Sequence, residues 1–238
     1  MKERNKIILQ NIDKRISYKL VVDTETCPLD RDLTDVVPSN MFAYDIGFAV
    51  TDKRGKVYEA YSFVNADIFL DEKALMKSAY YADKIPKYWA DIKNGSRTLT
   101  SHYNIRKTFC ETIANYGIVE IYAHNMRFDY GTLQNTQRWV TKSQYRNFFP
   151  KGVVICDTLK MARDVILKMP TYRKFCEENG FLTPRGQLKA TAECLYAFII
   201  DNPDFKESHT GLEDVLIEKE IMAYCYRQHH KMRKKLWE

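Results

Sequence analysis

The segment YKLVVDTETCPLD, residues 18–30, places two acidic side chains directly after an apolar run. The run predicts a buried strand over residues 18–25. Side chains two residues apart on a strand point to the same face, about 6 to 7 Å from each other, so Asp23 and Glu25 should lie side by side. Because two carboxylates repel each other where water is scarce, the pattern indicates that something positive lies between them.

The chain on either side of this strand alternates between strand and helix patterns. Two runs of aromatic and β-branched residues flank the turn at 53–55 and predict a hairpin that pairs with the first strand. Gly117 is placed to end one helix and Asn125 to cap the next. The expected elements, in chain order, are a loop at 26–40, hairpin strands at 42–52 and 56–65, helical sequence at 71–95, a helix at 100–117, strands at 118–123 and 152–157, and helices from 125 and from about 211.

This order of elements predicts an α/β fold. A hairpin followed by strand-helix units is typical of a mixed sheet, here five-stranded, built from the hairpin plus parallel strands and flanked by helices. The 238 residues, 45% of them hydrophobic, suffice for one substantial core. We therefore expect a single domain over residues 1–238, with helical insertions at about 66–102 and 168–206.

Composition argues against several classes of protein. No run approaches the roughly 18 apolar residues that cross a bilayer, so we expect a soluble, cytoplasmic protein without a membrane partner. The six cysteines contain no C-x-x-C pair, which favours reduced thiols over a zinc site or a disulfide framework. The net charge of +6 suits a polyanionic partner without requiring one.

Two further acids occupy the starts of predicted helices. Asp129 lies in the first turn of the helix that Asn125 is expected to cap. Asp214 lies in the opening turn of the last helix, where Thr210 and Glu213 fit a capping box. Taken alone, Asp23 and Glu25 are also explained as a charge pair on an edge strand, and Asp129 and Asp214 as acids that the helix dipole favours. Asp214, however, is on the apolar side of its helix and should point into the protein, so we expect the acids to converge at one end of the sheet.

Three motifs contain the four acids and a histidine. They are D-x-E at Asp23 and Glu25, H-N-x-x-F-D at Asn125, Phe128 and Asp129, and H-x-x-x-x-D at His209 and Asp214. Together they resemble the DEDDh exonucleases, also called DnaQ-like, a branch of the ribonuclease H-like superfamily, and the segment around Asp157 resembles the strand and helix before the last motif. The resemblance spans roughly residues 18–230. H-x-x-x-x-D also occurs at His124, so His209 is assigned by its place before the last helix, and the Y-x-x-x-D motif of the sister branch does not occur in the sequence.

The resemblance implies a two-metal nuclease site. Clustered carboxylates without a cysteine or histidine ligand set are hard oxygen donors, which suit Mg²⁺ or Mn²⁺. Two divalent cations about 3.5 to 4 Å apart can activate a water and stabilise a leaving oxygen. By the resemblance, Asp23 bridges both ions, Glu25 and Asp214 complete the more catalytic site, Asp129 holds the second ion, and His209 is the general base.

The implied reaction is hydrolysis of phosphodiester bonds from the 3′ end of single-stranded nucleic acid, DNA preferred, with release of nucleoside 5′-monophosphates. A DNA polymerase or another replication or repair protein is a candidate partner. Two alternatives stay open: an exoribonuclease of the same family, and a non-catalytic nucleic-acid-binding or protein-binding module that kept the fold. The expected substrate-binding residues are Thr26, Cys27, Met41, Phe42, Asn125 and Phe128.

Two basic stretches of the sequence each allow two interpretations. Residues 78–93 mix tyrosines, a tryptophan and lysines, a pattern that favours packing over a wall that guides a nucleic-acid strand. Residues 226–237 are interpreted as a solvated helix end, with phosphate contact as the alternative.

Overall fold

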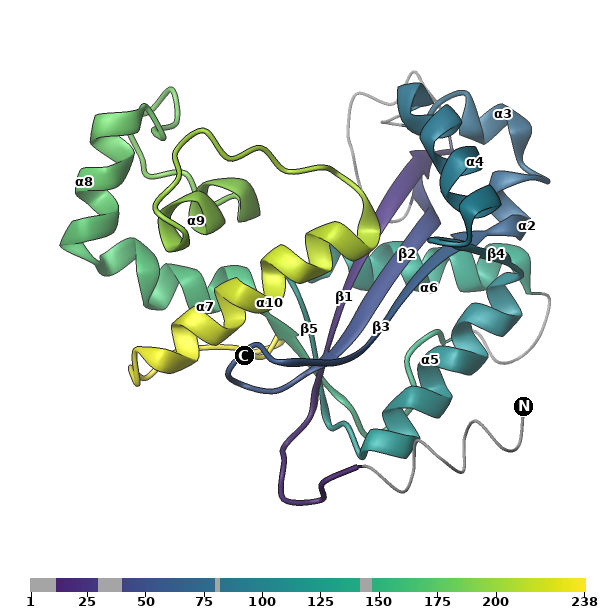
Figure 1. Cartoon of the computed structure of the whole chain (residues 1–238), viewed down its shortest axis with the longest axis horizontal. Coiled ribbons are helices and arrows are strands. Elements are labelled where there is room, and N and C mark those ends of the chain that lie inside the picture. The colour runs from purple at the N-terminus through teal and green to yellow at the C-terminus, as the bar shows by residue number, and fades with distance from the viewer. Residues whose placement is uncertain (1–11, 30–39, 80–81, 142–146) are drawn as a thin grey trace.

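The computed structural model describes residues 12–29, 40–79, 82–141 and 147–238. Its centre is a mixed six-stranded sheet with the order β4-β3-β2-β1-β5-β6 (Figure 1). β1 pairs antiparallel with β2 and parallel with β5, so it joins the hairpin half of the sheet to the parallel half. The strands are β1 (Lys19–Pro28), β2 (Met41–Thr51), β3 (Val57–Asn65), β4 (Thr98–Thr100), β5 (Glu120–Ala123) and β6 (Val154–Asp157).

The predicted α/β class is confirmed, with one strand more than the five expected. The additional strand, β4, has three residues, too few to give an alternating pattern in the sequence, and it pairs parallel with the end of β3. β1 is also longer than predicted. It continues to Pro28, so Thr26 and Cys27 belong to the strand and not to the loop expected at 26–40, of which 30–39 lie outside the described residues.

Helices cover both faces of the sheet (Figure 1). α5 (His102–Tyr116) and α6 (Arg127–Val140) pack on one face, and α7 (Thr158–Asp164) and α10 (Gly211–Arg227) on the other. Within the described ranges, no helix is both long and apolar enough to cross a membrane. The shorter helices are α2 (Ala66–Phe69), α3 (Lys73–Met76), η2 (Ala82–Lys84) and α4 (Ile85–Asn94) in the expected first insertion, then η3 (Ile166–Lys168), and α8 (Pro170–Asn179) and α9 (Ala192–Ile199) in the second.

The two faces of β1 belong to different hydrophobic cores. Leu20 and Val22 pack in the core beneath α5 and α6, whereas Val21 packs in the core beneath α7 and α10. Because side chains alternate along a strand, Asp23 and Glu25 follow Val21 onto the α10 face, and Thr24 follows Val22 onto the α6 face. All six cysteines, each in the described residues, are free, as the sequence predicted.

The start of α10 lies against the backbone of β2. Gly47, which is paired with Asp23 across the β1–β2 ladder, has its Cα so close to Gly211 that a Cβ on Gly47 would lie 2.3 Å from the Gly211 carbonyl carbon. A Cβ on Gly211 would in turn meet the Gly47 nitrogen at 2.8 Å. These contacts require glycine at both positions, and they bring the first turn of α10 next to the acidic end of β1.

One of the predicted helix ends is confirmed and two caps are wrong. Gly117 ends α5 in the left-handed conformation, with φ 62°. Asn125 does not cap α6, because its own φ is 63° and its N–H donates to Asp157 Oδ1 at 3.1 Å. Thr210 precedes α10 as predicted, but its side chain makes no capping bond; its N–H instead donates to Asp214 Oδ2 at 2.9 Å.

The carboxyl-terminal tail is not the solvated helix end that the sequence suggested. α10 ends at Arg227, and the chain then runs back along the outer edge of β6, where Lys235 forms an antiparallel bridge with Cys156. The Asp157 N–H donates to Lys234 O at 2.7 Å, and the Leu236 N–H donates to Ile155 O at 2.9 Å. Unpaired groups of an edge strand need partners, and the tail supplies them.

One tyrosine of the aromatic stretch at 78–93, Tyr88, packs in the protein interior. Tyr88 is 1% exposed and contacts Tyr44 and Phe69, with ring centroids 5.5 and 6.1 Å away. Trp89 is 47% exposed, and Tyr80 and Tyr81 lie outside the described residues. Packing is therefore the observed role of Tyr88.

Burial of His102 predicts a pH-dependent contribution to stability. The ring is fully buried at the start of α5, and desolvation lowers its pKa from 6.5 to about 4. Between these pH values the unfolded chain binds a proton that the folded chain excludes. This contribution is therefore complete above pH 6.5 and is lost as the pH falls towards 4.

We expect the His102→Phe variant to lack this acid sensitivity. The free energy of unfolding of the wild-type chain should fall relative to that of the variant by about 3 kcal/mol between pH 7 and pH 4. Urea titrations of both proteins at matched pH values measure the difference, and all other titrating groups cancel in it. A difference that stays constant with pH would contradict the assignment.

Candidate active site

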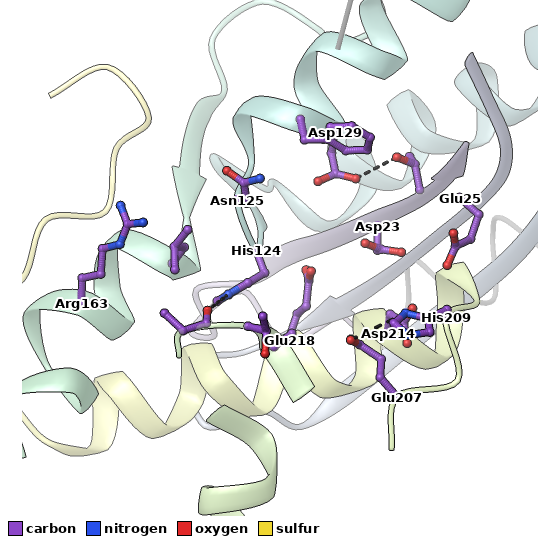
Figure 2. Close-up of a pocket in the computed structure, with 16 residues that line it drawn as sticks. Asp23, Glu25, His124, Asn125, Asp129, Arg163, Glu207, His209, Asp214 and Glu218 are labelled. Atoms are coloured by element: carbon purple, nitrogen blue, oxygen red, sulfur yellow. Dashed lines mark hydrogen bonds and ion pairs between the residues drawn. The ribbon is translucent and has the colours of Figure 1, made fainter. Parts of the chain in front are cut away.

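A pocket of about 570 Å³ opens where β5 stops and β1 continues (Figure 2). β5 pairs with β1 only as far as Val21 and Tyr122, and the chain turns away after Ala123, so the following residues of β1 lack a neighbour on that side. Acidic side chains from three elements point into the opening. The lining includes Asp23, Glu25, Asp129, Asp214 and Glu218, together with Glu207, His124, His209, Asn125, Phe128 and Arg163.

Both faces of β1 contribute to the acidic pocket. Asp23 and Glu25 point towards α10 (Figure 2), and the contact with Asp129 places the Thr24 side chain on the α6 face. The Thr24 hydroxyl donates to Asp129 Oδ1 at 2.8 Å, which fixes the carboxylate in the first turn of α6. Alternation along a single strand thus brings Asp129 and the D-x-E pair to the same opening.

Asp214 and His209 approach from the other side of the pocket. The Thr210 N–H holds Asp214 Oδ2, so the carboxylate folds back over the start of its own helix. His209 stands just before α10 with φ 50°, and its side chain is 41% exposed. One ligand atom each of Glu25, His209 and Asp214 lie within 4.8 Å of one another, close enough to hold one metal ion.

The carboxyl groups destabilise one another's charged forms. Burial, followed by the charges of Asp129 and Glu218, raises the pKa of Asp23 well above its usual value. Burial and the nearby Asp214 raise the pKa of Glu25 to about 9. Burial likewise raises the pKa of Asp129 to about 7, and burial together with Glu207 raises that of Asp214 to about 8. The pocket therefore favours cations, whose charge would compensate this repulsion.

The donor set fits a divalent metal ion. Asp214 Oδ1 and Glu218 Oε2 are buried oxygens without a hydrogen-bond partner among the described residues. Buried carboxylate oxygens without a partner are costly unless a cation or a proton completes them. All the acidic donors are oxygens, the ligands that Mg²⁺ and Mn²⁺ prefer.

Glu218, Glu207 and His124 are among the pocket residues that were not predicted as site residues from the sequence. Glu218 follows Asp214 by one helical turn on α10, so its position on the same helix face was a usable signal. Glu207 lies in the loop before the helix, with Oε2 3.8 Å from His209 Nδ1, and no periodicity marks it. His124 is held by Thr158 Oγ1 at 3.0 Å and by the Ala190 carbonyl at 2.8 Å, so both of its ring nitrogens are engaged.

The expected substrate-binding residues separate into two groups. Asn125 and Phe128 line the pocket. The other residues lie in β1 and β2, do not line the pocket, and are between 0 and 6% exposed; they are Thr26, Cys27, Met41 and Phe42. The sequence placed them beside a loop, whereas the longer β1 buries them.

No protein-family model and no curated protein matches the chain. Solved structures match most of its length. They are the zinc-bound E. coli ExoI–ssDNA complex (TM-score 0.51, 13% identity, 90% of this chain), the nuclease domain of 3'hExo, a DEDDh family member bound to rAMP (0.51, 11%, 94%), and a full-length 3'-exonuclease (0.53, 11%, 94%). The chain shares the fold of these nuclease domains. The fold expected from the sequence is thereby confirmed.

The overlap with these proteins differs in extent. The chain covers all of the 3'hExo nuclease domain, 64% of the full-length 3'-exonuclease and 41% of ExoI. Identities of 11 to 13% establish a common fold and nothing finer.

Like-charge repulsion in the pocket predicts that one neutralising substitution stabilises the metal-free protein. Glu218 is 3% exposed, and burial and Asp129 raise its pKa well above the usual value. In EDTA at pH 8, Glu218→Gln should raise Tm by roughly 2 to 4 °C for each kcal/mol of repulsion removed. The exposed Glu177 of α8 supplies the control, and Glu177→Gln should leave Tm unchanged. A lower Tm for Glu218→Gln, measured by calorimetry, would show that the repulsion is not significant.

Proposed function

We propose that the protein is a metal-dependent 3′→5′ exonuclease that releases nucleoside 5′-monophosphates. The observation that carries the proposal is the convergence of four acids from β1, α6 and α10 in one pocket beside His209. The similarity of the fold to nuclease domains supports it independently.

The chain offers ligands for two divalent cations. Asp23, Glu25 and Asp214 would hold one ion, and Asp23 and Asp129 would hold the other. When bound, Mg²⁺ or Mn²⁺ ions supply Lewis-acid activation of water and stabilisation of the leaving 3′ oxygen. The acids themselves are aligned by protein contacts, Asp129 by the Thr24 hydroxyl and Asp214 by the Thr210 N–H.

His209 is proposed as the general base. Burial and the charge of Lys84 lower its pKa, which keeps the imidazole neutral and able to accept a proton from the attacking water near pH 7. Its side chain is partly exposed beside Glu25 and Asp214. The engaged ring of His124 leaves no nitrogen available for the same role.

The proposed substrate is the 3′ end of a single-stranded nucleic acid, with DNA preferred over RNA. The similar ExoI structure is a complex with ssDNA, and the similar 3'hExo domain is bound to rAMP. Phe128 offers a ring for stacking and Asn125 a polar group at the mouth of the pocket. We do not extend the proposal to a polymerase partner, which no observation supports.

A non-catalytic binding module is the alternative. Such a module has no need to retain a cluster of mutually repelling carboxylates, so the raised pKa values of Glu25 and Asp214 favour the enzyme. Incubation with matched, 5′-labelled DNA and RNA strands separates the two. Shortening from the 3′ end with Mg²⁺ or Mn²⁺, blocked by EDTA, is the outcome expected of the enzyme; binding without shortening is that of the module.

Asp23→Asn should abolish digestion. The substitution removes the carboxylate that faces both groups of acids and leaves a side chain of the same size, so Tm in EDTA should not fall. We expect a loss of at least about 1,000-fold in kcat, comparable to that of removing one strong electrostatic contribution to a transition state. Gel analysis of single-turnover digestion measures it. Retention of wild-type turnover would remove Asp23 from the mechanism.

His209→Ala should slow hydrolysis without releasing the metal. General-base catalysis contributes about 100 to 10,000-fold, so kcat should fall in this range while the affinity for Mn²⁺ stays within about twofold. The exposed His230 provides the control, and His230→Ala should retain full activity. Because His209 also lies within reach of a metal held by Glu25 and Asp214, a parallel loss of Mn²⁺ affinity would assign it as a ligand instead of a base.

A further inference from the structure

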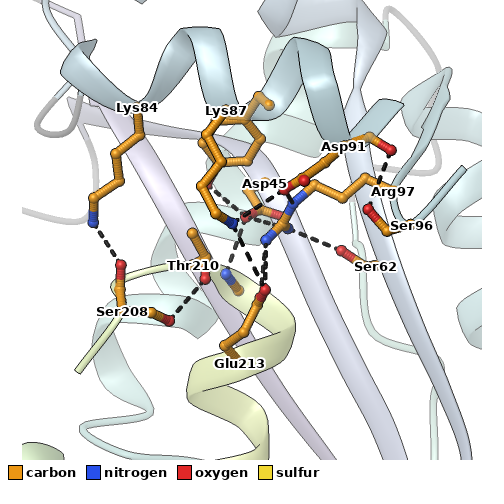
Figure 3. A network of polar contacts seen from close by, with 12 residues as sticks. Asp45, Ser62, Lys84, Lys87, Asp91, Ser96, Arg97, Ser208, Thr210 and Glu213 are labelled. Carbon is orange, nitrogen blue, oxygen red and sulfur yellow. Dashed lines mark hydrogen bonds and ion pairs between the residues drawn. The ribbon is translucent and has the colours of Figure 1, made fainter. Parts of the chain in front are cut away.

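A buried network of charged and polar groups connects the first insertion to the start of α10 (Figure 3). Asp45 of β2 is at its centre and is fully buried. It accepts hydrogen bonds from Tyr88 Oη at 2.7 Å, from Arg97 Nη1 at 2.9 Å and from the Gly211 N–H at 3.0 Å. The Asp45 carboxylate therefore binds the insertion and the first residue of α10 at the same time.

Arg97 carries the buried positive charge of this network. It lies just before β4, is 4% exposed, and donates to Glu213 Oε2 on α10 at 2.9 Å as well as to Asp45. Its remaining donors reach Asp91 Oδ2 at 3.1 Å and Ser62 Oγ at 2.9 Å. A guanidinium with all its sides engaged fixes the angle between the elements it joins, which a single-point ammonium cannot do.

Lys84 holds the segment that bears the histidine. Its Nζ donates to the carbonyl oxygens of Ser208 at 2.6 Å and His209 at 3.2 Å. His209 has the left-handed φ of 50°, an uncommon conformation for a residue other than glycine, so its backbone requires such external support. The contact comes from η2 of the insertion, more than 120 residues away in the sequence.

The network also acts on β1. Asp45 is directly opposite Glu25 in the β1–β2 register, and like charges in that position repel each other. Arg97 neutralises Asp45 and leaves Glu25 as the carboxylate that needs a cation. The Gly47–Gly211 contact fixes the same turn of α10 against β2 at the residue paired with Asp23.

We propose that the first insertion is a positioning device for the active site: its Lys84 and Arg97, together with Asp45 of β2, fix His209 and Asp214 at the distance from Glu25 that hydrolysis requires. None of the three is proposed to touch substrate. They are positioning residues that act through the start of α10. The expected effect on turnover rests on the proposed exonuclease function. A merely structural network would contribute to stability and leave turnover per folded molecule unchanged.

Lys84→Met is the gentlest test, because it removes only the ammonium and leaves the apolar stem. Since the charge of Lys84 also lowers the pKa of His209, kcat is compared on the plateau of the pH profile, where the imidazole is neutral in both proteins. We expect kcat on a labelled single strand to fall about 10 to 100-fold, the loss typical of a small misplacement of reacting groups, with KM and Tm near those of the wild type. Lys93→Met is the matched control, since Lys93 is an exposed lysine of α4 and its loss should change nothing. Unchanged kcat would overturn the inference, and a raised KM with unchanged kcat would assign Lys84 to substrate contact.

Two substitutions that together leave the net charge unchanged, at Asp45 and Arg97, test the centre of the network. Arg97→Gln alone leaves Asp45 buried without its counter-charge and should be strongly destabilised. The double variant Asp45→Asn with Arg97→Gln removes one charge of each sign, so it should recover much of the lost Tm. If the network positions the site, the double variant should still have kcat reduced at least about tenfold, because the charged ties to Gly211 and Glu213 are gone. Recovery of both Tm and kcat would leave only a structural role.

Binding of Mn²⁺ separates this inference from the proposed function. The double variant keeps the net charge of the protein, so electrostatics over long range do not alter its affinity for cations. Displacement of Asp214 from Glu25 should weaken Mn²⁺ binding, followed by electron paramagnetic resonance, by about 10 to 100-fold, as removal of supporting groups does at other metal sites. If the wild-type protein digests no strand, the proposed function fails and this affinity still decides the inference; wild-type affinity in the double variant would reject positioning.

Discussion

Mutual repulsion of the pocket carboxylates is the constraint on which the arrangement of this protein depends. Burial and neighbouring acids raise the pKa values of Asp23, Glu25 and Asp214, so each charged form is costly in the absence of a cation. Such an arrangement persists only where packing elsewhere holds its elements in place. β1 lies in the middle of the sheet, and the glycine contact of α10 with β2 provides that hold.

The geometry of a strand explains how so few elements assemble the pocket. β1 extends past the end of β5, and its alternating side chains bind α6 through Thr24 and face α10 through Asp23 and Glu25. The first turn of α6 supplies Asp129 on one side of β1. On the other side, the first turn of α10 supplies Asp214, and the segment before it supplies His209. A pocket made from strand and helix ends is held more rigidly than one made from loops, which suits a reaction that depends on fixed distances.

The two segments predicted as insertions, 66–102 and 168–206, make contacts at the pocket and beside it. The predicted first insertion does not line the pocket, but its charged side chains contact the backbone just before α10 and Glu213 in the first turn of that helix. Three acids surround the buried Arg97, which offsets the cost of removing its charge from water. The second insertion contributes Ala190 to the pocket, where its carbonyl accepts from His124.

The sequence by itself determined the class of the fold and the identity of the acidic cluster, because period-two alternation fixes which face of β1 carries Asp23 and Glu25, and because the acids at the starts of α6 and α10 follow local patterns. It did not reveal β4, the path of the tail along β6, or the burial of Thr26 and Cys27. Those depend on pairing between distant segments, which leaves no local period. Tertiary structure alone brought Glu207 into the pocket and paired Arg97 with Asp45 behind the start of α10, since contacts across more than 50 residues are set by how the layers pack.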